Sequence, residues 1–293
     1  MPELPEVETI ANDLRPHLVG RTIIRCELSF PGMVRHPEPE VFVDSIAGQR
    51  IESVGRRGKY ILIGLTDHLL LVVHLGMTGQ LRLVDASAPL AKHTHVVLAL
   101  DGAAKHMDPP GAASRSLEQG GTQQLRYIDP RRFGRLLLGT EEDLLLSKKM
   151  PRLGPEPIDP DFAAEELYVN LRRRRTSLKA VLLDQRAVAG VGNIYADESL
   201  HRAGLRPDRL AGTVSRKSAR RLHESLRDSL RAAILNRGSS VDTYRDAWGE
   251  IGAQQEKLLV YGRAGEPCFT CGRPLSVIRL AGRTTVFCRR CQK

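Results

Sequence analysis

The sequence predicts an α+β protein with a sheet-rich first half, a helical second part and a short cysteine-bearing tail. Runs of β-forming residues, broken by Gly, Pro and Asp, occupy most of residues 21–139. Apolar residues at helical spacing dominate residues 162–236. Four of the five cysteines follow residue 267. A chain of 293 residues is long enough for two domains.

The first half is predicted to begin with a helix and continue as a sheet. Acidic residues in the opening turn of residues 3–18 complement the dipole of a short amphipathic helix. The spacing of the β-rich runs that follow predicts a β-sandwich or barrel. These runs are residues 22–28, 51–54, 60–65, 69–75, 96–100, 125–128 and 135–138. Residues 102–122 are rich in Gly, Ala, Ser and Pro and are expected to form a long, flexible hairpin insertion.

The second half begins after a proline-rich connection at residues 153–160, which predicts a domain boundary. In the last of the predicted helices, Leu222, Leu226, Leu230 and Ile234 recur at four-residue steps, and Gly238 follows as a C-terminal cap. Residues 239–256 are polar and are expected to form a loop. The predicted helices are residues 162–173, 177–185, 194–203 and 215–236.

Charge and hydropathy limit the classes of protein that fit. The net charge is +10, and residues 141–293 hold 28 Lys and Arg against 19 Asp and Glu. A basic half attracts a polyphosphate partner such as nucleic acid, although a solubility role would give the same excess. No apolar run approaches the roughly 18 residues that a bilayer crossing requires. Residues 1–6 do not resemble a secretory signal, so we expect a cytoplasmic protein.

The cysteine tail has the spacing of a metal site. Cys268 and Cys271 form one C-x2-C pair, and Cys288 and Cys291 form a second pair after 16 intervening residues. Four thiolates in two such clips satisfy tetrahedral Zn²⁺ and leave no ligand position for water, so the zinc is predicted to be structural. Two disulfides or an iron site are the alternatives, and a reducing cytoplasm favours zinc. Cys26, alone in an apolar strand, is expected to be a packing residue.

The N-terminus offers a candidate nucleophile. Removal of Met1 would make Pro2 the first residue, and its secondary amine could add to an aldehyde carbon and form an iminium. An α-amino group has an ordinary pKa of about 7.7 to 8.0, so a neutral fraction exists near pH 7. Glu3, the next residue, could act as a general acid or base. A proline at position 2 that serves only N-terminal processing is the alternative.

Five motifs stand in a fixed order from the N-terminus toward the cysteine tail, and together with the tail they resemble one family. The motifs are PELPEVET (2–9), RRGKY (56–60), HLGMTG (74–79), DPRRFG (129–134) and GVGNIYADE (190–198). With the cysteine tail they resemble the formamidopyrimidine-DNA glycosylase family from end to end. The insertion at residues 102–122 departs from the tight hairpin that is usual there.

The resemblance implies a bifunctional DNA glycosylase and AP lyase. Such an enzyme excises oxidised purines, mainly 8-oxoguanine and formamidopyrimidines, from double-stranded DNA and cuts the backbone by β,δ-elimination. It implies a β-sandwich domain with a leading helix (1–150), a helical domain with a helix-two-turn-helix and a base-recognition loop (151–256), and a four-cysteine zinc finger with a β-hairpin (257–293). DNA would lie in the cleft between the domains. We expect one structural Zn²⁺, a monomer without membrane association, and a cytoplasmic location at the nucleoid.

The resemblance also assigns roles to single residues. Pro2 and Glu3 would be catalytic, and Lys59 and Arg283 would hold phosphates and aid the eliminations. His74 and Asn193 would hold phosphates around the flipped nucleotide, Asn193 from a glycine-rich helix start whose N–H groups suit an anion. Met77, Arg131 and Phe133 would fill the space that the damaged base leaves. His93 and Arg174 would be further DNA contacts. The alternative makes Met77 and Phe133 core residues and Arg131 a surface charge.

Two other functions remain open at this point. An endonuclease VIII-like enzyme has the same fold and prefers oxidised pyrimidines, but Leu4 together with Met77, Arg131 and Phe133 favours the purine enzyme. A zinc-dependent DNA-binding protein without catalysis would need neither Pro2 nor Glu3.

Overall fold

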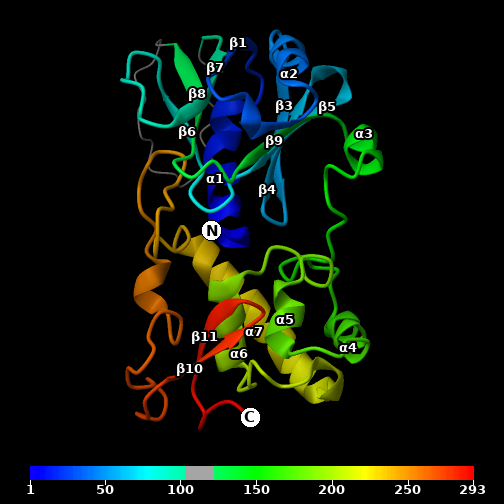
Figure 1. The fold of residues 1–293 in the computed structure, drawn as a ribbon, viewed down its shortest axis with the longest axis vertical. Helices are drawn as coiled ribbons and strands as arrows, with labels where there is room; N and C mark the ends of the chain where they lie inside the picture. The colour runs from blue at the N-terminus through cyan, green and yellow to red at the C-terminus, as the bar shows by residue number, and fades with distance from the viewer. Residues whose placement is uncertain (103–121) are drawn as a thin grey trace. The chain divides into compact units, whose positions relative to one another are not determined.

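The computed structural model describes residues 1–102 and 122–293 (Figure 1). The predicted insertion at 102–122 lies outside the described residues except for its two ends. The chain divides into two compact units, which are described separately. Unit 1 consists of Met1–Pro2, Glu6–Pro151 and Ser239–Gly252, and unit 2 consists of Glu3–Pro5, Arg152–Gly238 and Ala253–Lys293.

Unit 1 contains the predicted β-sandwich. A four-stranded sheet has the order β1-β7-β8-β6, and a five-stranded sheet has the order β2-β9-β5-β4-β3. All the pairings in these sheets are antiparallel except that of β2 with β9. The strands are β1 (Ile23–Leu28), β2 (Val34–His36), β3 (Ile51–Arg57), β4 (Tyr60–Leu65), β5 (Leu69–His74), β6 (Gln80–Asp85), β7 (Thr94–Leu100), β8 (Gln123–Ile128) and β9 (Arg135–Thr140). The prediction of an α+β chain with a leading helix and a sandwich is confirmed.

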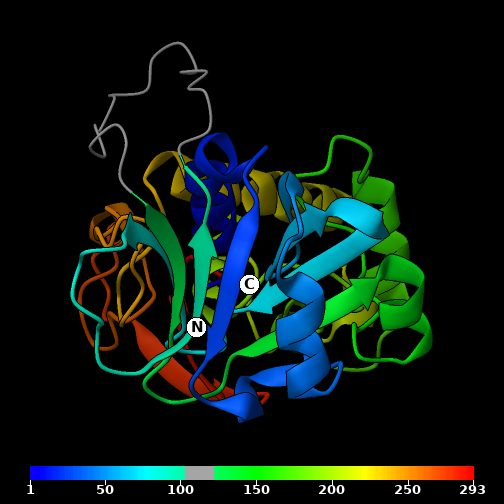
Figure 2. The same ribbon diagram turned by 90° about the horizontal axis from the view of Figure 1, so that it is seen from above.

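The leading helix, α1 (Leu4–Leu18), runs alongside the two sheets (Figures 1 and 2). From Val7 onward, its buried apolar side chains belong to the core that both sheets share. Val7, Ile10, Leu14 and Leu18 are completely buried, and their spacing places them along one side of the helix. Burial of each such side chain stabilises the fold by about 1.5–3 kcal/mol. The first residues of the chain are therefore fixed by the core rather than free.

Four short elements of unit 1 were missed by the sequence analysis. These are β2, β6 and the helices α2 (Pro39–Ile46) and α3 (Glu141–Leu146). β6 does show the period of a strand, because Leu81 and Leu83 are buried and alternate with less buried neighbours. α3 has too few residues for a helical period and begins at a side-chain cap, in which the Thr140 hydroxyl accepts the Asp143 N–H. Short 3-10 turns occur at η1 (Pro31–Met33) and η2 (Thr66–His68).

Unit 2 is helical, as predicted. Leu222, Leu226 and Leu230 of its longest helix are completely buried, and Gly238 after the helix has a left-handed φ of 80°. The Ser215 hydroxyl caps the N-terminus of this helix by accepting the Ser218 N–H. The helices are α4 (Ala164–Arg172), α5 (Leu178–Leu183), α6 (Asn193–Arg202) and α7 (Arg216–Leu235), with 3-10 turns at η3 (Ala211–Thr213) and η4 (Gln254–Lys257).

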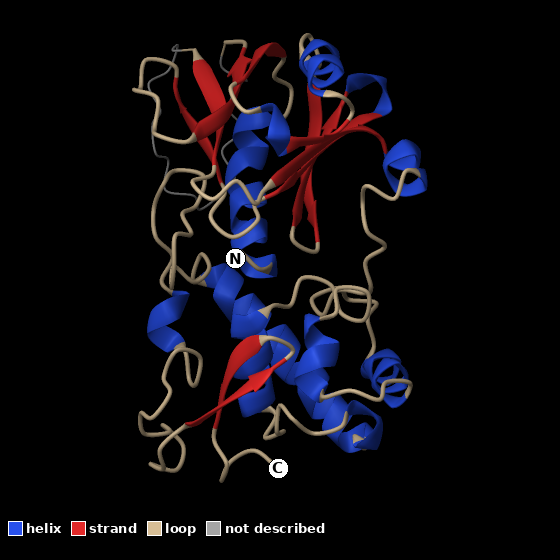
Figure 3. Ribbon diagram, viewed as in Figure 1, coloured by secondary structure: helices blue, strands red, loops and turns tan. Residues whose placement is uncertain are grey.

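The C-terminal tail is a small hairpin with little core of its own. Strands β10 (Ser276–Leu280) and β11 (Arg283–Phe287) pair antiparallel (Figure 3). Its core consists of Val260, Leu275 and Val286 around the buried cysteines. Among the helices of residues 1–102 and 122–293, none has the length and apolar character needed to cross a membrane.

Candidate active site and metal centre

The carboxylate of Glu3 lies at the N-terminus of α6. Its side chain is only 2 % exposed. Oε2 accepts the backbone N–H of Gly192 at 2.7 Å, and Oε1 accepts that of Ile194 at 2.8 Å. A third donor is the Tyr195 N–H, 3.4 Å from Oε2. The first N–H groups of a helix have no partner within the helix and favour an anion, so this helix start holds Glu3 in one position.

The glycines of the GVGN motif make room for the first residues of the chain. A Cβ atom on Gly192 would lie 2.4 Å from the Glu3 carboxyl carbon, and one on Gly190 would lie 2.6 Å from a Leu4 methyl carbon. The Leu4 N–H also donates to the Gly190 carbonyl oxygen at 3.0 Å. The GVGN sequence predicts that these N–H groups are available to a phosphate. In the structure, three of the groups at this helix start donate to Glu3 instead.

α6 also holds the strand that begins with Arg283. The Asn193 amide donates to the Thr284 carbonyl oxygen at 3.2 Å. Asp197 accepts the Val286 N–H at 3.1 Å and forms an ion pair with Lys179 at 2.7 Å, with both charged side chains fully buried. Lys179 in turn donates to the Thr285 hydroxyl at 2.8 Å. These contacts fix β11, while the Arg283 side chain at its start is exposed.

Lys59 and His74 lie on neighbouring parts of the five-stranded sheet in unit 1. Lys59 directly precedes β4, is 6 % exposed and follows Gly58, whose φ is +58°. His74 ends β5 and pairs in register with Tyr60. Burial, and then the positive charges of Lys59 and Arg135, lower the pKa of His74 to about 4. His74 is therefore a neutral imidazole at pH 7.

Two loops of unit 1 present Met77, Arg131 and Phe133, and Asp129 joins these loops. Asp129 is completely buried. Its carboxylate accepts the Thr78 hydroxyl at 2.5 Å and the N–H groups of Arg131 at 3.2 Å and Gly134 at 2.8 Å. Phe133 is 51 % exposed, and the Arg131 guanidinium stacks on its ring at 4.7 Å. Phe133 is thus not the core residue of the alternative interpretation.

Close backbone packing holds these two loops together. A Cβ atom on Gly76 would lie 2.6 Å from the Phe133 carbonyl carbon, and one on Gly134 would collide with the Tyr127 hydroxyl. Tyr127 is 1 % exposed, and its hydroxyl donates to the His74 carbonyl oxygen at 3.3 Å. Glycine is required at Gly76 because two backbones pass each other at contact distance, and at Gly134 because the Tyr127 hydroxyl occupies the place of a side chain.

His93 and Arg174 are the remaining predicted contacts. The His93 carbonyl oxygen accepts the Asp129 N–H at 3.0 Å, so His93 lies beside the loop that bears Arg131 and Phe133. His93 has a left-handed φ of 67°. In unit 2, the half-buried Arg174 forms an ion pair with Asp184 at 3.1 Å. Arg174 therefore already has an acidic partner in this structure.

Of the predicted loop 239–256, residues 239–253 form a loop and residues 254–256 belong to the 3-10 turn η4. Part of the loop is core. Tyr244 and Ala247 are buried in the core of unit 1, and the Glu6 carboxylate accepts the Ser239 N–H at 2.8 Å. The indole of Trp248 packs edge-on against His17 with ring centroids 4.9 Å apart. This loop is anchored on α1 by the buried Tyr244 and the half-buried Trp248.

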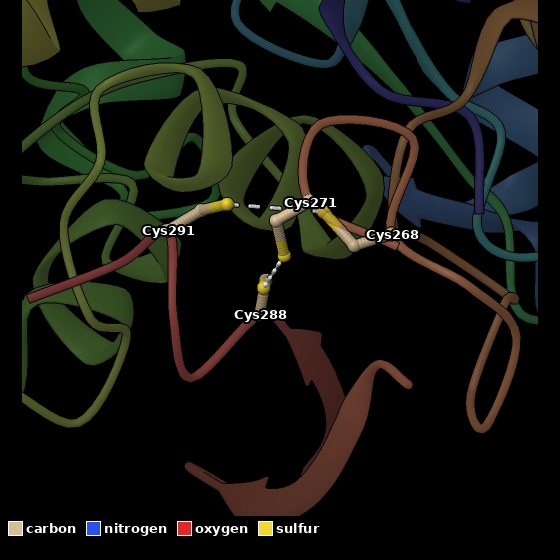
Figure 4. A group of neighbouring side chains, drawn as sticks. All are labelled: Cys268, Cys271, Cys288 and Cys291. Atoms are coloured by element: carbon tan, nitrogen blue, oxygen red, sulfur yellow. Dashed lines mark hydrogen bonds between the residues drawn. The ribbon is translucent and has the colours of Figure 1, made fainter. Parts of the chain in front are cut away.

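The four tail cysteines fit a tetrahedral zinc ion (Figure 4). All four Sγ atoms lie within 4.8 Å of one another, and the pairs Cys268–Cys291 and Cys271–Cys288 are 3.9 and 3.5 Å apart. Sulfur atoms about 2.3 Å from one ion are roughly 3.8 Å apart in a tetrahedron. Burial raises the pKa of the Cys268 thiol, but hydrogen bonds from His201 and the backbone outweigh it and lower the pKa to about 6. A zinc ion there would link the two ends of the hairpin.

Comparison with known domains defines the class of protein. The formamidopyrimidine-DNA glycosylase N-terminal domain matches residues 1–136, the H2TH domain of the same enzymes matches residues 153–245, and a zinc finger found in FPG and IleRS matches residues 265–293. A sandwich, a helical H2TH domain and a zinc finger define a DNA glycosylase. The chain belongs to the formamidopyrimidine-DNA glycosylase family and has the glycosylase and lyase activities that are characteristic of it.

Individual relatives agree along the whole chain. The formamidopyrimidine-DNA glycosylase of Desulforamulus reducens is 43 % identical over 100 % of this chain and 99 % of its own, and that of Moorella thermoacetica is 46 % identical over 95 % of both. Lactococcus lactis Fpg in complex with abasic-site DNA matches with a TM-score of 0.86 and 36 % identity over 99 % of both chains. Thermus thermophilus MutM matches with a TM-score of 0.84 and 40 % identity over 99 % of this chain and 98 % of its own.

Several residues that build these sites were missed by the sequence analysis. Asp129 stands inside the DPRRFG motif, but its hydrogen bond to Thr78 links positions 51 residues apart. The Lys179–Asp197 ion pair and the contact of His201 with Cys268, at 3.6 Å, likewise join distant positions. The one available signal was Lys179, a charged residue inside the otherwise apolar segment of α5.

Proposed function

We propose that the protein excises oxidised purines, 8-oxoguanine and formamidopyrimidines, from double-stranded DNA through a Schiff base on Pro2 and then cuts the strand by β,δ-elimination. The observation that carries this proposal is the buried Glu3 carboxylate, held by N–H groups of Gly192, Ile194 and Tyr195. The carboxylate is fixed one residue from the candidate nucleophile. Complexes of Lactococcus lactis Fpg with DNA containing Fapy-dG or an abasic site support the substrate class.

The proposed chemistry uses the amine of Pro2 after removal of Met1. The nitrogen lone pair attacks C1′ of the flipped nucleotide, and the bond to the base breaks with its electron pair leaving on the base. The Glu3 carboxylate accepts the proton that the Pro2 nitrogen loses on attack and delivers it to the ring oxygen. The bond between C1′ and that oxygen then breaks, and the nitrogen lone pair forms the iminium. The iminium acidifies the C2′ proton, whose loss expels the 3′ phosphate, and a second elimination releases the 5′ phosphate. Glu3 transfers protons between these steps.

Phosphate binding is assigned to four residues. Lys59 and Arg283 act as positive charges toward phosphates of the damaged strand and aid both eliminations. His74 and Asn193 bind phosphates from β5 and from the start of α6. The burial of Lys59 and the hydrogen bond of Asn193 to Thr284 support fixed positions for Lys59 and Asn193.

The space left by the flipped base is assigned to Met77, Arg131 and Phe133. The exposed Phe133 ring would wedge between base pairs, Met77 would fill space and Arg131 would donate to the orphaned cytosine. The rigid connection of both loops through Asp129 supports this role. His93 and Arg174 are assigned as further DNA contacts, and Arg174 would exchange Asp184 for a phosphate.

The proposal includes the organisation and the location of the chain. Residues 1–150 would form the catalytic domain, residues 151–256 the H2TH domain with the base-recognition loop, and residues 257–293 the zinc finger. Zn²⁺ on Cys268, Cys271, Cys288 and Cys291 would supply a structural link. The enzyme would act in the cytoplasm at the nucleoid.

The experiment is borohydride trapping on duplexes that contain 8-oxoguanine or thymine glycol, followed by mass spectrometry of the adduct peptide. We expect the adduct on Pro2 and stronger trapping on 8-oxoguanine. Pro2→Gly should abolish trapping, and Glu3→Gln should lower excision on the order of 10²–10⁴-fold. Both variants should bind lesion DNA. Glu40→Gln is the control, because Glu40 is an exposed carboxylate on α2.

Three results would contradict the proposal. Full nicking activity of protein that retains Met1 would exclude the Pro2 amine. Stronger trapping on thymine glycol would favour the endonuclease VIII-like enzyme. Unchanged activity of both Pro2→Gly and Glu3→Gln would exclude the proposed roles of Pro2 and Glu3 in catalysis.

A further inference from the structure

Three polar side chains form one row across the five-stranded sheet of unit 1. Tyr60 on β4 pairs in register with His74 on β5, which pairs in register with Arg135 on β9. Residues in register on neighbouring strands lie on the same face of a sheet. The next row on this face is apolar and consists of Leu62, Val72 and Leu137. The polar row therefore borders a hydrophobic surface.

The segment after α3 covers this row and closes a pocket. Lys148, Lys149 and Pro151 line the pocket together with Tyr60, Val72, His74, Arg135 and Leu137, and its volume is about 200 Å³. Arg135, Lys148 and Lys149 are exposed, and no acidic side chain lines the pocket in the part of the chain that the structure describes. Three permanent positive charges thus face one small space.

His74 contributes a hydrogen-bond donor to this pocket. Its Nδ1 accepts the Gly76 N–H at 3.2 Å, so the proton of the neutral imidazole is on Nε2. The Tyr60 hydroxyl is a second neutral donor, and Tyr60 and His74 rings are 4.9 Å apart. Cations together with N–H and O–H donors suit a compact oxyanion.

We propose that this pocket binds a phosphomonoester end of the cut DNA strand. Three cations favour a dianionic phosphomonoester over a singly charged backbone diester, and the pocket is smaller than the 300–1,000 Å³ of a site for a drug-sized ligand. The assignment to DNA rests on the proposed function, because β,δ-elimination is the step that creates such ends. Arg135, Lys148 and Lys149 belong to none of the motifs in the sequence. The pocket would hold the product after both bonds are cut.

The test measures binding of synthetic product duplexes with a one-nucleotide gap by fluorescence anisotropy. Four duplexes carry a 3′ phosphate, a 5′ phosphate, both or neither at the gap, and inorganic phosphate is a separate competitor. We expect the intact protein to bind a phosphate-ended gap about tenfold more tightly than the hydroxyl-ended gap. Lys148→Ala/Lys149→Ala, and separately Arg135→Ala, should reduce this preference to about twofold or less.

The control is Lys217→Ala/Arg221→Ala, which removes two exposed positive charges from α7. This control should lower affinity for all four duplexes alike and keep the tenfold preference. The same uniform loss in Lys148→Ala/Lys149→Ala would overturn the proposal, because it would show general electrostatic attraction. Inorganic phosphate that binds as tightly as the phosphate-ended gap would overturn the assignment to a DNA end.

The outcome is independent of the Pro2 mechanism. Binding of a finished product needs no Schiff base, so failure of borohydride trapping would leave the end preference measurable. Loss of the end preference with normal trapping would refute the pocket alone. Folding of the variants in unit 1 is checked by the emission of Trp248, the one tryptophan of the chain, which lies in unit 1, and folding of the control variant on α7 is checked by circular dichroism.

Discussion

A single methyl group at Gly192 would collide with the Glu3 carboxyl group. Gly192→Ala would place a carbon 2.4 Å from the Glu3 carboxyl carbon, although the φ of −130° at this position suits any residue. We expect the carboxylate to move and excision to fall on the order of 10²-fold, because displacements near 1 Å have such effects on catalysis. Single-turnover excision of 8-oxoguanine measures the rate.

The matched control for Gly192→Ala is Gly55→Ala. A Cβ atom at Gly55 meets nothing within 4 Å. This variant should keep the wild-type rate, and both variants should bind lesion DNA normally. Full activity of Gly192→Ala would show that the position of Glu3 is not critical.

The second prediction at the scale of a residue concerns His74 and pH. Its pKa falls from 6.5 to about 4 in the folded protein. In the unfolded chain, His74 therefore becomes protonated below pH 6.5, whereas in the folded protein it becomes protonated only near pH 4. Stability from this group is present above pH 6.5 and is lost as the pH falls toward 4. The loss amounts to about 3 kcal/mol between pH 7 and pH 4.

Urea unfolding at several pH values checks the His74 prediction. Between pH 7 and pH 4 the free energy of unfolding falls in both proteins, and the fall in His74→Asn should be about 3 kcal/mol smaller than in the wild type. His68→Asn, at an exposed histidine, should follow the wild-type curve. Parallel curves for His74→Asn and wild type would contradict the prediction.

At the scale of an element, α6 organises unit 2. Its N-terminus holds Glu3, and Asn193 and Asp197 hold β11. The next residue, Glu198, accepts the N–H groups of Leu259, Val260 and Tyr261, each at 2.9 Å. The same helix thus fixes the proposed catalytic carboxylate and the strand that begins with Arg283. A shift of α6 would move both groups together.

The buried pair Lys179–Asp197 is the contact of α6 that we expect to be most sensitive to substitution. Burial lowers the pKa of Lys179 and raises that of Asp197 to about 6, although each partner opposes the shift of the other. Removal of one partner leaves a buried charge without compensation. Lys179→Met or Asp197→Leu should each lower the free energy of unfolding by about 3–5 kcal/mol.

A double-mutant cycle tests this ion pair. The Lys179→Met/Asp197→Leu variant should be less destabilised than either single variant, because no isolated charge remains. Denaturant unfolding of unit 2, monitored by circular dichroism, gives the free energies of unfolding of the two single variants and of the double variant. Additive losses in the double variant would show that the two charges do not interact.

The elements that the sequence predicted are those with a repeating pattern of burial. α7 repeats its leucines every four residues, and β4 alternates buried and half-buried positions. α2 and α3 have only eight and six residues, so they show no distinct helical period, whereas the equally short α5 was predicted because it lies in the longer apolar run 177–185. The zinc site was predictable because its ligands lie in two short clips near each other in the sequence.

The candidate site was predictable in its residues but not in its connections. The GVGN motif was correctly associated with a helix start, yet the anion at this start is Glu3, about 190 positions away in the chain. The hydrogen bond from Thr78 to Asp129 could not be predicted either, because the two residues are 51 positions apart. Local spacing indicates which groups are chemically suited to a site, whereas tertiary packing decides which groups occupy it.

At the scale of the whole molecule, each unit has its own core. The larger core, which includes α1 and strands of both sheets, lies within unit 1, and the helical core lies within unit 2. The chain crosses between the units more than once, because Leu4 belongs to the helical core while Tyr244 and Ala247 belong to the core of unit 1. The cysteine cluster has a third, much smaller core.

This arrangement predicts a selective effect of zinc removal. The tail buries few apolar residues, and structural zinc supplies about 10–16 kcal/mol of folding free energy in isolated zinc fingers. A strong chelator should therefore disorder the hairpin with Arg283 and abolish binding of lesion DNA.

Trp248 reports on unit 1, where it packs against His17, so its emission and its urea midpoint should stay unchanged. A colorimetric assay measures the released zinc, anisotropy measures DNA binding, and tryptophan fluorescence measures the folding of unit 1. Cys288→Ser should reproduce the chelated state without chelator, and a shift of the Trp248 midpoint on chelation would show that the folding of unit 1 depends on the metal.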